Sequence, residues 1–380
     1  MADKDATRRD ILDRAEMVVV KVGTNVLADA KGALDRSRIA DLAAQLHRLR
    51  LAGKRVVLVS SGAIGAGVGR LGLGKRPVDL PHLQACAAIG QCALMQTYQE
   101  CLVPFGIPAA QILLTAGDFD NRVRYLNVRH TILTLFEYNC LPVINENDTV
   151  SVAEIKFGDN DHLAAMVANL LQAPLLVLLT NVDGLYSGDP RENPSAALVE
   201  TVPHIDRTIT EMAGTTRSTL GTGGMKSKLR AARLATAAGG AVIMANGSTP
   251  GILDTIFQAE PVGTLFLPHG EALSARRRWL GLTARPKGVF RLDEGARRAV
   301  EREGRSLLPV GITTVEGSFG KGDVVSLCDA NGIEFARGLT NYSSADAERI
   351  RGLATDQIAR AVGRVPYVEM VHRDNLAVVA

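Results

Sequence analysis

The sequence predicts an α/β protein: an open, mostly parallel sheet in a three-layer αβα sandwich, followed by a small, mainly β, barrel-like domain. Three observations support this prediction. The chain has 380 residues, which is more than one average domain. It is 46% hydrophobic but only 4% aromatic, a composition typical of α/β proteins with buried parallel strands. After Pro268 the pattern changes to short apolar runs separated by glycines.

Five short runs of Val, Ile and Leu predict the strands of the sheet. The runs are continuous rather than alternating, as expected for strands that helices cover on both faces. They are residues 17–22, 56–60, 142–144, 175–180 and 241–245. Helical patterns lie between them at 39–49, 161–172 and 225–238. This alternation predicts a ligand site at the carboxyl ends of the strands.

The same patterns divide the chain into five segments. We expect an N-terminal extension 1–15, the α/β domain 16–266, a linker 267–286, the β domain 287–368 and a C-terminal tail 369–380. In the β domain the sequence predicts a charged helix at 294–303 and strands at 311–315, 324–327 and 334–336. Asn331-Gly332, between the last two strands, is a strong hairpin signal.

Composition and charge favour a cytoplasmic protein without a membrane partner. The formal charge of +3 is small for this length and gives no reason to expect a nucleic-acid partner. The five cysteines include no C-x-x-C pair, which favours reduced thiols over a metal or redox site. The first residues are charged rather than apolar, so no signal peptide is predicted, and no apolar run reaches membrane-spanning length.

Two nucleotide-binding motifs overlap in the glycine-rich stretch from Gly62 to Lys75, and both fail. A phosphate-binding P-loop needs Ser or Thr after its lysine, whereas Arg and Pro follow Lys75. The dinucleotide pattern that begins at Gly67 lies several residues beyond the strand, and no second strand ends in an acidic residue after it. We assign the glycines through Gly74 to backbone flexibility.

Polar or small residues stand at the ends of four predicted strands. The first strand ends in Lys21-Val22-Gly23-Thr24, and a lysine among valines needs either an anionic partner or a solvent-exposed edge of the sheet for its charge. Ser61-Gly62-Ala63 follows the second strand, where backbone amides can meet substrate oxygens. Asn145-Glu146-Asn147-Asp148 follows the third, and Thr180-Asn181 ends the fourth. Asn160-Asp161 opens a helix, as either a cap or a ligand group.

The stretch from Gly221 to Lys228 opens the last helix of the domain. Glycine amides at a helix N-terminus, with a lysine in the first turn, predict a phosphate cradle. Lys21 and Lys228 are far apart in sequence but are both expected at one rim of the sheet. Lysines, amides and carboxylates without a nucleophile suit phosphoryl transfer, in which magnesium bridges the nucleotide phosphates.

Together these motifs resemble the amino-acid kinase family, and in particular its glutamate-phosphorylating members. The matching stretches are 19–24, 61–63, 143–148, 158–161 and 221–228. Beyond the linker, the stretches 307–312, 317–323 and 337–338 resemble a PUA domain, which such members carry in bacteria. The resemblance covers nearly the whole chain apart from the N-terminal extension.

The resemblance implies ATP-dependent phosphorylation of the γ-carboxylate of L-glutamate to γ-glutamyl phosphate, the first step of proline biosynthesis. The transfer would be direct and in line, without a covalent enzyme intermediate, and would use ATP with Mg²⁺. The resemblance also implies feedback inhibition by proline and a homo-oligomer, either a dimer or a tetramer. It implies hand-off of the product to glutamyl phosphate reductase.

Residue roles follow from the same resemblance. The catalytic positions match Lys21, Lys228 and Asp161. Glutamate-binding positions match Ser61, Gly62, Ala63, Asn145, Asp148 and Asn160. ATP-binding positions match Lys21, Gly23, Thr24, Thr180, Asn181, Thr222, Gly223, Gly224, Met225, Lys226, Ser227 and Lys228. Asn181 stands where relatives often have Asp, so either it or Asp183 makes the nucleotide contact.

Two alternatives compete with this hypothesis. A sister kinase of the same fold would act on acetylglutamate, aspartate, carbamate or UMP, but the PUA-like region and the 145–148 and 158–161 motifs argue against these. An RNA-binding protein would act through the PUA domain. Basic and acidic residues are about balanced after Pro286, with no aromatic-interleaved basic stripe, which argues against RNA.

Overall fold

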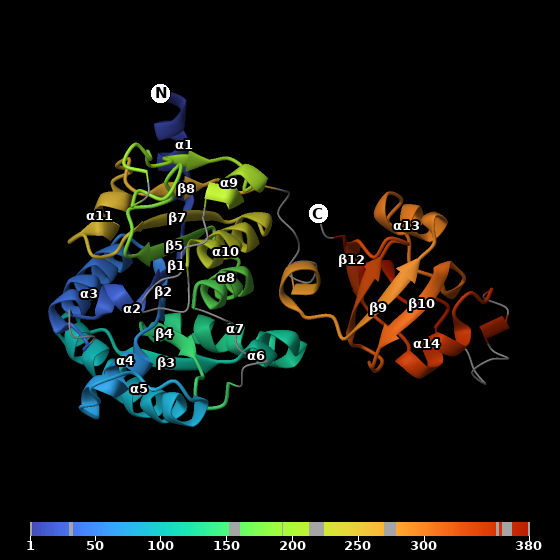
Figure 1. Cartoon of the computed structure of the whole chain (residues 1–380), viewed down its shortest axis with the longest axis horizontal. Coiled ribbons are helices and arrows are strands. Elements are labelled where there is room, and N and C mark those ends of the chain that lie inside the picture. The colour runs from blue at the N-terminus through green and yellow to red at the C-terminus, as the bar shows by residue number, and fades with distance from the viewer. Residues whose placement is uncertain are drawn as a thin grey trace. The chain divides into compact units, whose positions relative to one another are not determined.

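The structure is a computed structural model that describes residues 2–29, 33–151, 160–191, 193–212, 224–269, 279–354, 357–358 and 367–378. The chain forms two compact units, Met1–Ala272 and Leu273–Ala380, shown in Figure 1. Among the described residues, no helix is both long and apolar enough to cross a membrane.

The first unit contains an eight-stranded sheet in the order β3-β4-β2-β1-β5-β7-β8-β6. Neighbouring strands are parallel except β7 and β8. The strands are β1 (Met17–Val22), β2 (Arg55–Ser60), β3 (Ala109–Leu114), β4 (Leu141–Glu146), β5 (Leu175–Thr180), β6 (Thr201–Val202), β7 (Ala241–Asn246) and β8 (Thr264–Phe266). Every residue of β1, β4 and β5 is buried, which explains their continuous apolar sequences.

Helices cover both faces of this sheet, so the predicted three-layer α/β fold is confirmed (Figure 1). One layer contains α3 (Arg36–Leu51), α5 (Leu80–Leu102) and α11 (Ile252–Phe257), whose buried side chains share one core with the strands. The other layer contains α7 (Arg122–Glu137), α8 (Asn160–Leu171) and α10 (Met225–Ala237). The shorter helices are α2 (Thr24–Leu27), α4 (Ala63–Arg70), α6 (Ala116–Asp120) and α9 (Arg207–Met212).

Helix α1 (Ala2–Arg14) packs against this unit rather than standing apart from it. The buried Arg8 donates hydrogen bonds to the backbone oxygens of Glu260 and Val262, at 3.1 and 2.8 Å. Leu12 belongs to the same core as the strands. The N-terminal segment therefore contributes to the packing of the first unit.

All five predicted strands are confirmed, and the third is longer than expected. Asn145 and Glu146 lie inside β4 instead of after it, because Asn145 pairs with Leu113 of β3 and Glu146 with Leu114. The sequence did not predict β3, β6 and β8. Strand β3 lies at the sheet edge with only its last residue fully buried, and the other two have two or three residues each.

Gly67, one of the glycines assigned to backbone flexibility, instead allows two helices to pack closely, so the expectation was wrong for this glycine. A Cβ on Gly67 of α4 would lie 1.9 Å from the backbone oxygen of Cys86 in α5. A Cβ on Gly90 of α5 would lie 1.8 Å from the backbone oxygen of Ala63. The two helix backbones are thus in direct contact, and we call this contact the glycine seam.

Replacing Gly67 by Ala should destabilise the protein by about 3 kcal/mol, since the added methyl overlaps a backbone atom and the helices must separate. Gly69→Ala is the matched control in the same helix, because its Cβ would have no neighbour closer than 3.7 Å. That change should leave stability unchanged or raise it by up to about 1 kcal/mol through helix propensity. Urea unfolding measures both values. Equal effects of the two substitutions would contradict the seam.

The second unit contains a five-stranded sheet in the order β10-β9-β11-β12-β13. The strands are β9 (Gly288–Leu292), β10 (Ile312–Gly317), β11 (Val324–Cys328), β12 (Glu334–Leu339) and β13 (Leu376–Val378), with helices α13 (Glu294–Glu301) and α14 (Ser344–Ile350). The predicted hairpin is confirmed: β11 and β12 are antiparallel, and Gly332 has φ +82° in their turn.

Residues outside the expected β domain also belong to this second sheet and its core. Strand β13 pairs with β12, although we expected a separate tail there. Met370 and Val371 are fully buried in the core of the unit. Trp279 and Leu280, expected in the linker, are buried as well. The second unit therefore extends beyond the stretch that the sequence pattern indicated.

Candidate active site

The centre of the candidate site is a buried carboxylate held between two lysines. Asp161 lies in the first turn of α8 and is only 1% exposed. One of its oxygens is 2.5 Å from Nζ of Lys21 in β1. The other oxygen is 3.0 Å from Nζ of Lys228 in α10 and accepts a hydrogen bond from Ser227. The structure thus brings together the three residues that the sequence predicted to be catalytic.

Charge explains why this cluster is stable in the interior. Burial by itself would raise the pKa of the Asp161 carboxyl, but the two lysines outweigh it and lower that pKa to about 2. The carboxylate is therefore ionised at neutral pH. Two ammonium groups that converge on one carboxylate favour binding of an anion beside them.

The N-terminus of α10 adds to this positive field. Gly224 precedes the helix as its N-cap residue, and Ser227 and Lys228 lie in the first turn. Met225 is partly buried and Lys226 is exposed, so these two side chains are not part of the lysine–aspartate cluster. A helix N-terminus attracts anions through its free N–H groups and dipole. Thr222 and Gly223, also predicted to bind ATP, lie outside the described residues, as does the stretch 158–159.

Backbone amides at the ends of β1 and β2 are partly committed within the sheet. The N–H of Gly23 donates to Leu179, and the N–H of Ser61 donates to Val22. The Ser61 amide is therefore used within the sheet, and the expectation that backbone amides of residues 61–63 meet substrate oxygens rests on Gly62 and Ala63. Gly62 has φ +107° and forms the N-cap of α4, with Ala63 as the first helical residue. Only glycine adopts such a backbone at low cost, so this tight turn depends on Gly62.

Amide and hydroxyl groups from three elements form a second cluster beside the lysines. Asn160 donates from Nδ2 to Oγ of Ser61 at 2.8 Å, to the backbone oxygen of Ser60 at 3.2 Å and to Oδ1 of Asn145 at 2.9 Å. Asn145 is 3% exposed. Asp148 lies in the turn that follows β4 and is partly buried. Three of the predicted glutamate-binding side chains thus lie in contact with one another.

The end of β5 provides the remaining predicted positions. Thr180 is buried and donates from Oγ1 to Oδ1 of Asn181 at 3.3 Å, whereas Asn181 is exposed. The carboxylate of Asp183 accepts one hydrogen bond from Asn246 and one from Tyr186, both at 2.9 Å. Thr24 begins the short helix α2 after β1.

Sequence reasoning missed several residues that support these groups. Asn246 ends β7, so the same strand-end rule would have found it had the strand been extended by one residue. Tyr98 of α5 is fully buried and hydrogen-bonded to the hydroxyl of Ser60 at 2.8 Å, and burial raises its pKa. Gln91 contacts Asn145 from the same helix. Residues inside a long helix give no strand-end signal.

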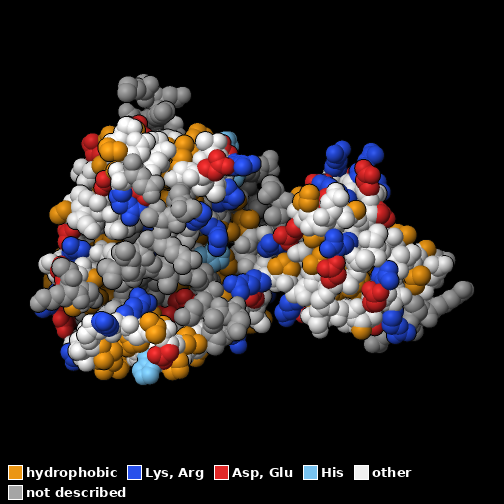
Figure 2. All heavy atoms as spheres, viewed as in Figure 1, with side chains coloured by type: hydrophobic (Ala, Val, Ile, Leu, Met, Phe, Trp, Pro, Cys, Tyr) orange, Lys and Arg blue, Asp and Glu red, His pale blue; other side chains and the backbone are white. Residues whose placement is uncertain are grey.

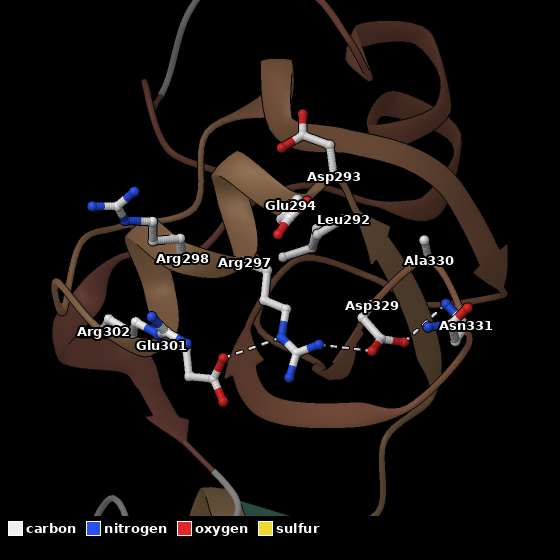
Figure 3. A pocket seen from close by; sticks show the side chains of 10 residues that line it. All are labelled: Leu292, Asp293, Glu294, Arg297, Arg298, Glu301, Arg302, Asp329, Ala330 and Asn331. Carbon is white, nitrogen blue, oxygen red and sulfur yellow. Dashed lines mark hydrogen bonds and ion pairs between the residues drawn. The ribbon is translucent and has the colours of Figure 1, made fainter.

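The second unit has a hollow of about 540 Å³ along α13, shown in Figure 3. Its central guanidinium, on Arg297, is paired with Glu301 at 3.1 Å and Asp329 at 2.8 Å. On the face seen in Figure 2, basic and acidic side chains alternate over this unit. The charge of Arg297 is therefore compensated inside the domain.

An open α/β sheet that carries buried lysines and a helix N-terminus at its strand ends defines an anion-binding site of the kind used for phosphoryl transfer. Residues 16–246 match the model of the amino acid kinase family, and residues 288–362 match the PUA domain. The chain belongs to the amino acid kinase family, with a PUA domain after the family's catalytic unit.

Known proteins are similar over nearly the whole chain. A protein of Geobacter metallireducens named "Glutamate 5-kinase" is 48% identical over 371 residues, covering 98% of this chain and 100% of the relative. Proteins with the same name from Geobacter sulfurreducens and Rhodopirellula baltica are both 46% identical, and 98% of this chain is covered in each case. The match includes 100% and 96% of those relatives, respectively.

The pKa of Asp161 leads to a pH-dependent prediction. Its folded-state pKa of about 2 lies below the ordinary 3.8, so ionised Asp161 stabilises the fold above pH 4, and this contribution is lost as pH falls towards 2. The stability advantage over Asp161→Asn should shrink by about 1 kcal/mol between pH 6 and pH 3. Urea unfolding of both proteins at the two pH values measures it. A constant or growing advantage would contradict the ion-pair arrangement.

Proposed function

We propose that this protein transfers the γ-phosphoryl group of ATP to the γ-carboxylate of L-glutamate, forming γ-glutamyl phosphate and ADP. The observation that supports this best is the buried Asp161 with Lys21 and Lys228, which gathers two cations at one rim of the sheet. The full-length similarity to proteins named "Glutamate 5-kinase" supports glutamate as the acceptor.

The proposed reaction needs no general base, because a carboxylate is already ionised at neutral pH. An oxygen of the γ-carboxylate attacks the γ-phosphorus in line, and the bond from phosphorus to the bridging oxygen breaks, leaving its electron pair on ADP. Both reactants are anions, so their repulsion is the main obstacle. Lys21 and Lys228 offset this repulsion and stabilise the charge of the transferring group. Asp161 keeps the two ammonium groups in place.

We assign glutamate and the nucleotide to opposite sides of the lysine–aspartate cluster. On the glutamate side we place Ser61, Asn145, Asp148 and Asn160, with Gly62 and Ala63 presenting backbone at the start of α4. On the nucleotide side we place the ends of β1 and β5 and the start of α10. The residues on that side are Gly23, Thr24, Thr180, Asn181, Gly224, Met225, Lys226 and Ser227. Asp183, which accepts hydrogen bonds from Asn246 and Tyr186, is better anchored there than Asn181.

In the proposed reaction, magnesium binds together with ATP and neutralises charge on its phosphates. Among the described residues, no three His, Cys, Asp or Glu side chains form a metal-binding group, and both oxygens of Asp161 contact lysines. Mg²⁺ in nucleotide sites is held largely by phosphate oxygens and water. We therefore assign no protein side chain to it.

The cellular setting is proposed from the same family resemblance. We place the protein in the cytoplasm as a homo-oligomer, a dimer or tetramer, in the first step of proline biosynthesis. Proline would act as a feedback inhibitor. The product is an acyl phosphate, a reactive species, so a reductase that consumes glutamyl phosphate is the natural next enzyme.

Trapping the product tests the proposed reaction. The protein is incubated with ATP, Mg²⁺, L-glutamate and hydroxylamine, which converts an acyl phosphate to a coloured hydroxamate. We expect hydroxamate that depends on glutamate and forms much more slowly with aspartate or N-acetylglutamate. Absence of glutamate-dependent hydroxamate, or equal rates with the three acceptors, would refute the proposal.

Two substitutions distinguish the roles of the two sides. Lys228→Ala should lower kcat about 100-fold or more with a small change in the KM for glutamate, because its charge acts on the transferring group. Asp148→Ala should raise the KM for glutamate about tenfold with a smaller change in kcat. Lys75→Ala is the control: Lys75 is exposed and lies in the stretch that only partly matches a P-loop, so this variant should match the parent protein. A reversed pattern would mean that the two sides are misassigned.

A further inference from the structure

Four amide side chains form one continuous chain of hydrogen bonds that ends at the glutamate side of the site. Asn160 donates to Asn145 at 2.9 Å, and Asn145 donates from Nδ2 to Oε1 of Gln91 at 2.9 Å. Gln91 in turn donates from Nε2 to Oε1 of Gln111 at 3.1 Å. The chain links the start of α8, β4, α5 and the exposed edge strand β3.

The chain has a single direction, and this direction fixes how each amide is turned. Oδ1 of Asn145 accepts from Asn160 and also from the N–H of Glu146, while its Nδ2 points to Gln91. Turning the Asn145 amide over would set donor against donor at Asn160 and at the N–H of Glu146, and acceptor against acceptor at Gln91. Asn145 is 3% exposed, so losing Gln91 would leave a buried donor without an acceptor, which proteins avoid. Gln91 thus holds Asn145 in this orientation.

The orientation of Asn145 determines what Asn160 and Ser61 present to a ligand. Nδ2 of Asn160 is committed to three acceptors inside the protein, and within the described residues Oδ1 of Asn160 has no hydrogen-bond partner. Asn160 therefore offers an acceptor. Ser61 already accepts from Asn160, so its hydroxyl hydrogen is available to donate. An acceptor beside a donor matches the ammonium and carboxylate of an amino acid.

We infer that Gln91 is a positioning residue for substrate selection: together with the backbone groups of Ser60 and Glu146 it holds the polarity of the amide chain, so that the site takes a free α-ammonium group. This inference rests on the proposed phosphorylation of glutamate. Gln91 reaches Asn145 because the glycine seam brings α5 against α4, since its neighbour Gly90 is one of the two seam glycines. Acceptors whose α-nitrogen is acylated or replaced by oxygen would lose the contact that this polarity provides.

The test compares three variants in the hydroxamate assay. Gln91→Met removes the acceptor but keeps the length of the side chain. Gln91→Glu keeps an acceptor for Nδ2 of Asn145. Gln96→Met is the matched control on the exposed side of the same helix, where the side chain of Gln96 donates a hydrogen bond to Glu100. The KM for glutamate, the KM for ATP and kcat are measured for each, with L-glutamate and with 2-hydroxyglutarate, which has a hydroxyl in place of the ammonium.

For Gln91→Met we expect the KM for glutamate to rise about tenfold, with kcat and the KM for ATP within about threefold of the parent. Its preference for glutamate over 2-hydroxyglutarate should fall by a similar factor. Gln91→Glu should keep the KM for glutamate within about threefold, and Gln96→Met should match the parent.

Several outcomes would overturn the inference. They are an unchanged KM in Gln91→Met, an equal loss with both acceptors, or a fall in kcat without a change in KM. If Gln91→Met does not fold, Gln91→Glu decides alone, and a tenfold rise in its KM for glutamate counts against the inference. Failure of the parent protein to form glutamate hydroxamate is a separate result, which refutes the proposed function instead.

Discussion

The site depends on one electrostatic contact, the carboxylate of Asp161 between the ammonium groups of Lys21 and Lys228. Each lysine is less than 10% exposed, and burying an ammonium without a counter-charge is prohibitively costly. The contact requires the central strand β1, the start of α8 and the start of α10 to converge. The sheet order, which places β1 between β2 and β5, provides that convergence. The same charge cluster therefore links Lys21, near the start of the domain sequence, with Lys228, near its end.

The amide cluster depends on a different constraint, the close approach of α4 and α5. Gly67 and Gly90 let the two backbones touch, and this contact brings Gln91 within hydrogen-bond reach of Asn145 in β4. The charged cluster and the amide cluster meet at the start of α8, where Asn160 joins one and Asp161 the other. The start of this one helix thus sets the spacing between the lysines and the amide cluster.

Much of this arrangement could be predicted from the sequence, for identifiable reasons. Lys21 is recognisable because a lysine is unusual among the valines of a buried strand, and Lys228 because several glycines precede its helix. Gln91 and Tyr98 cannot be recognised in this way, because a polar residue in a long helix is usually solvated. The glycine seam was not predicted because the sequence does not distinguish a glycine that allows close helix packing from one that provides backbone flexibility. Edge strand β3 lacks the buried Val and Ile pattern of the central strands.

The two clusters also differ in what they can discriminate. Ammonium groups attract any nearby phosphate or carboxylate, because charge attraction has little directional preference. Oriented amides distinguish a donor from an acceptor, since presenting the wrong partner leaves a desolvated polar group unpaired. In the proposed reaction, selection among acceptor molecules therefore belongs mainly to the amide cluster, and the lysines act on the rate of transfer.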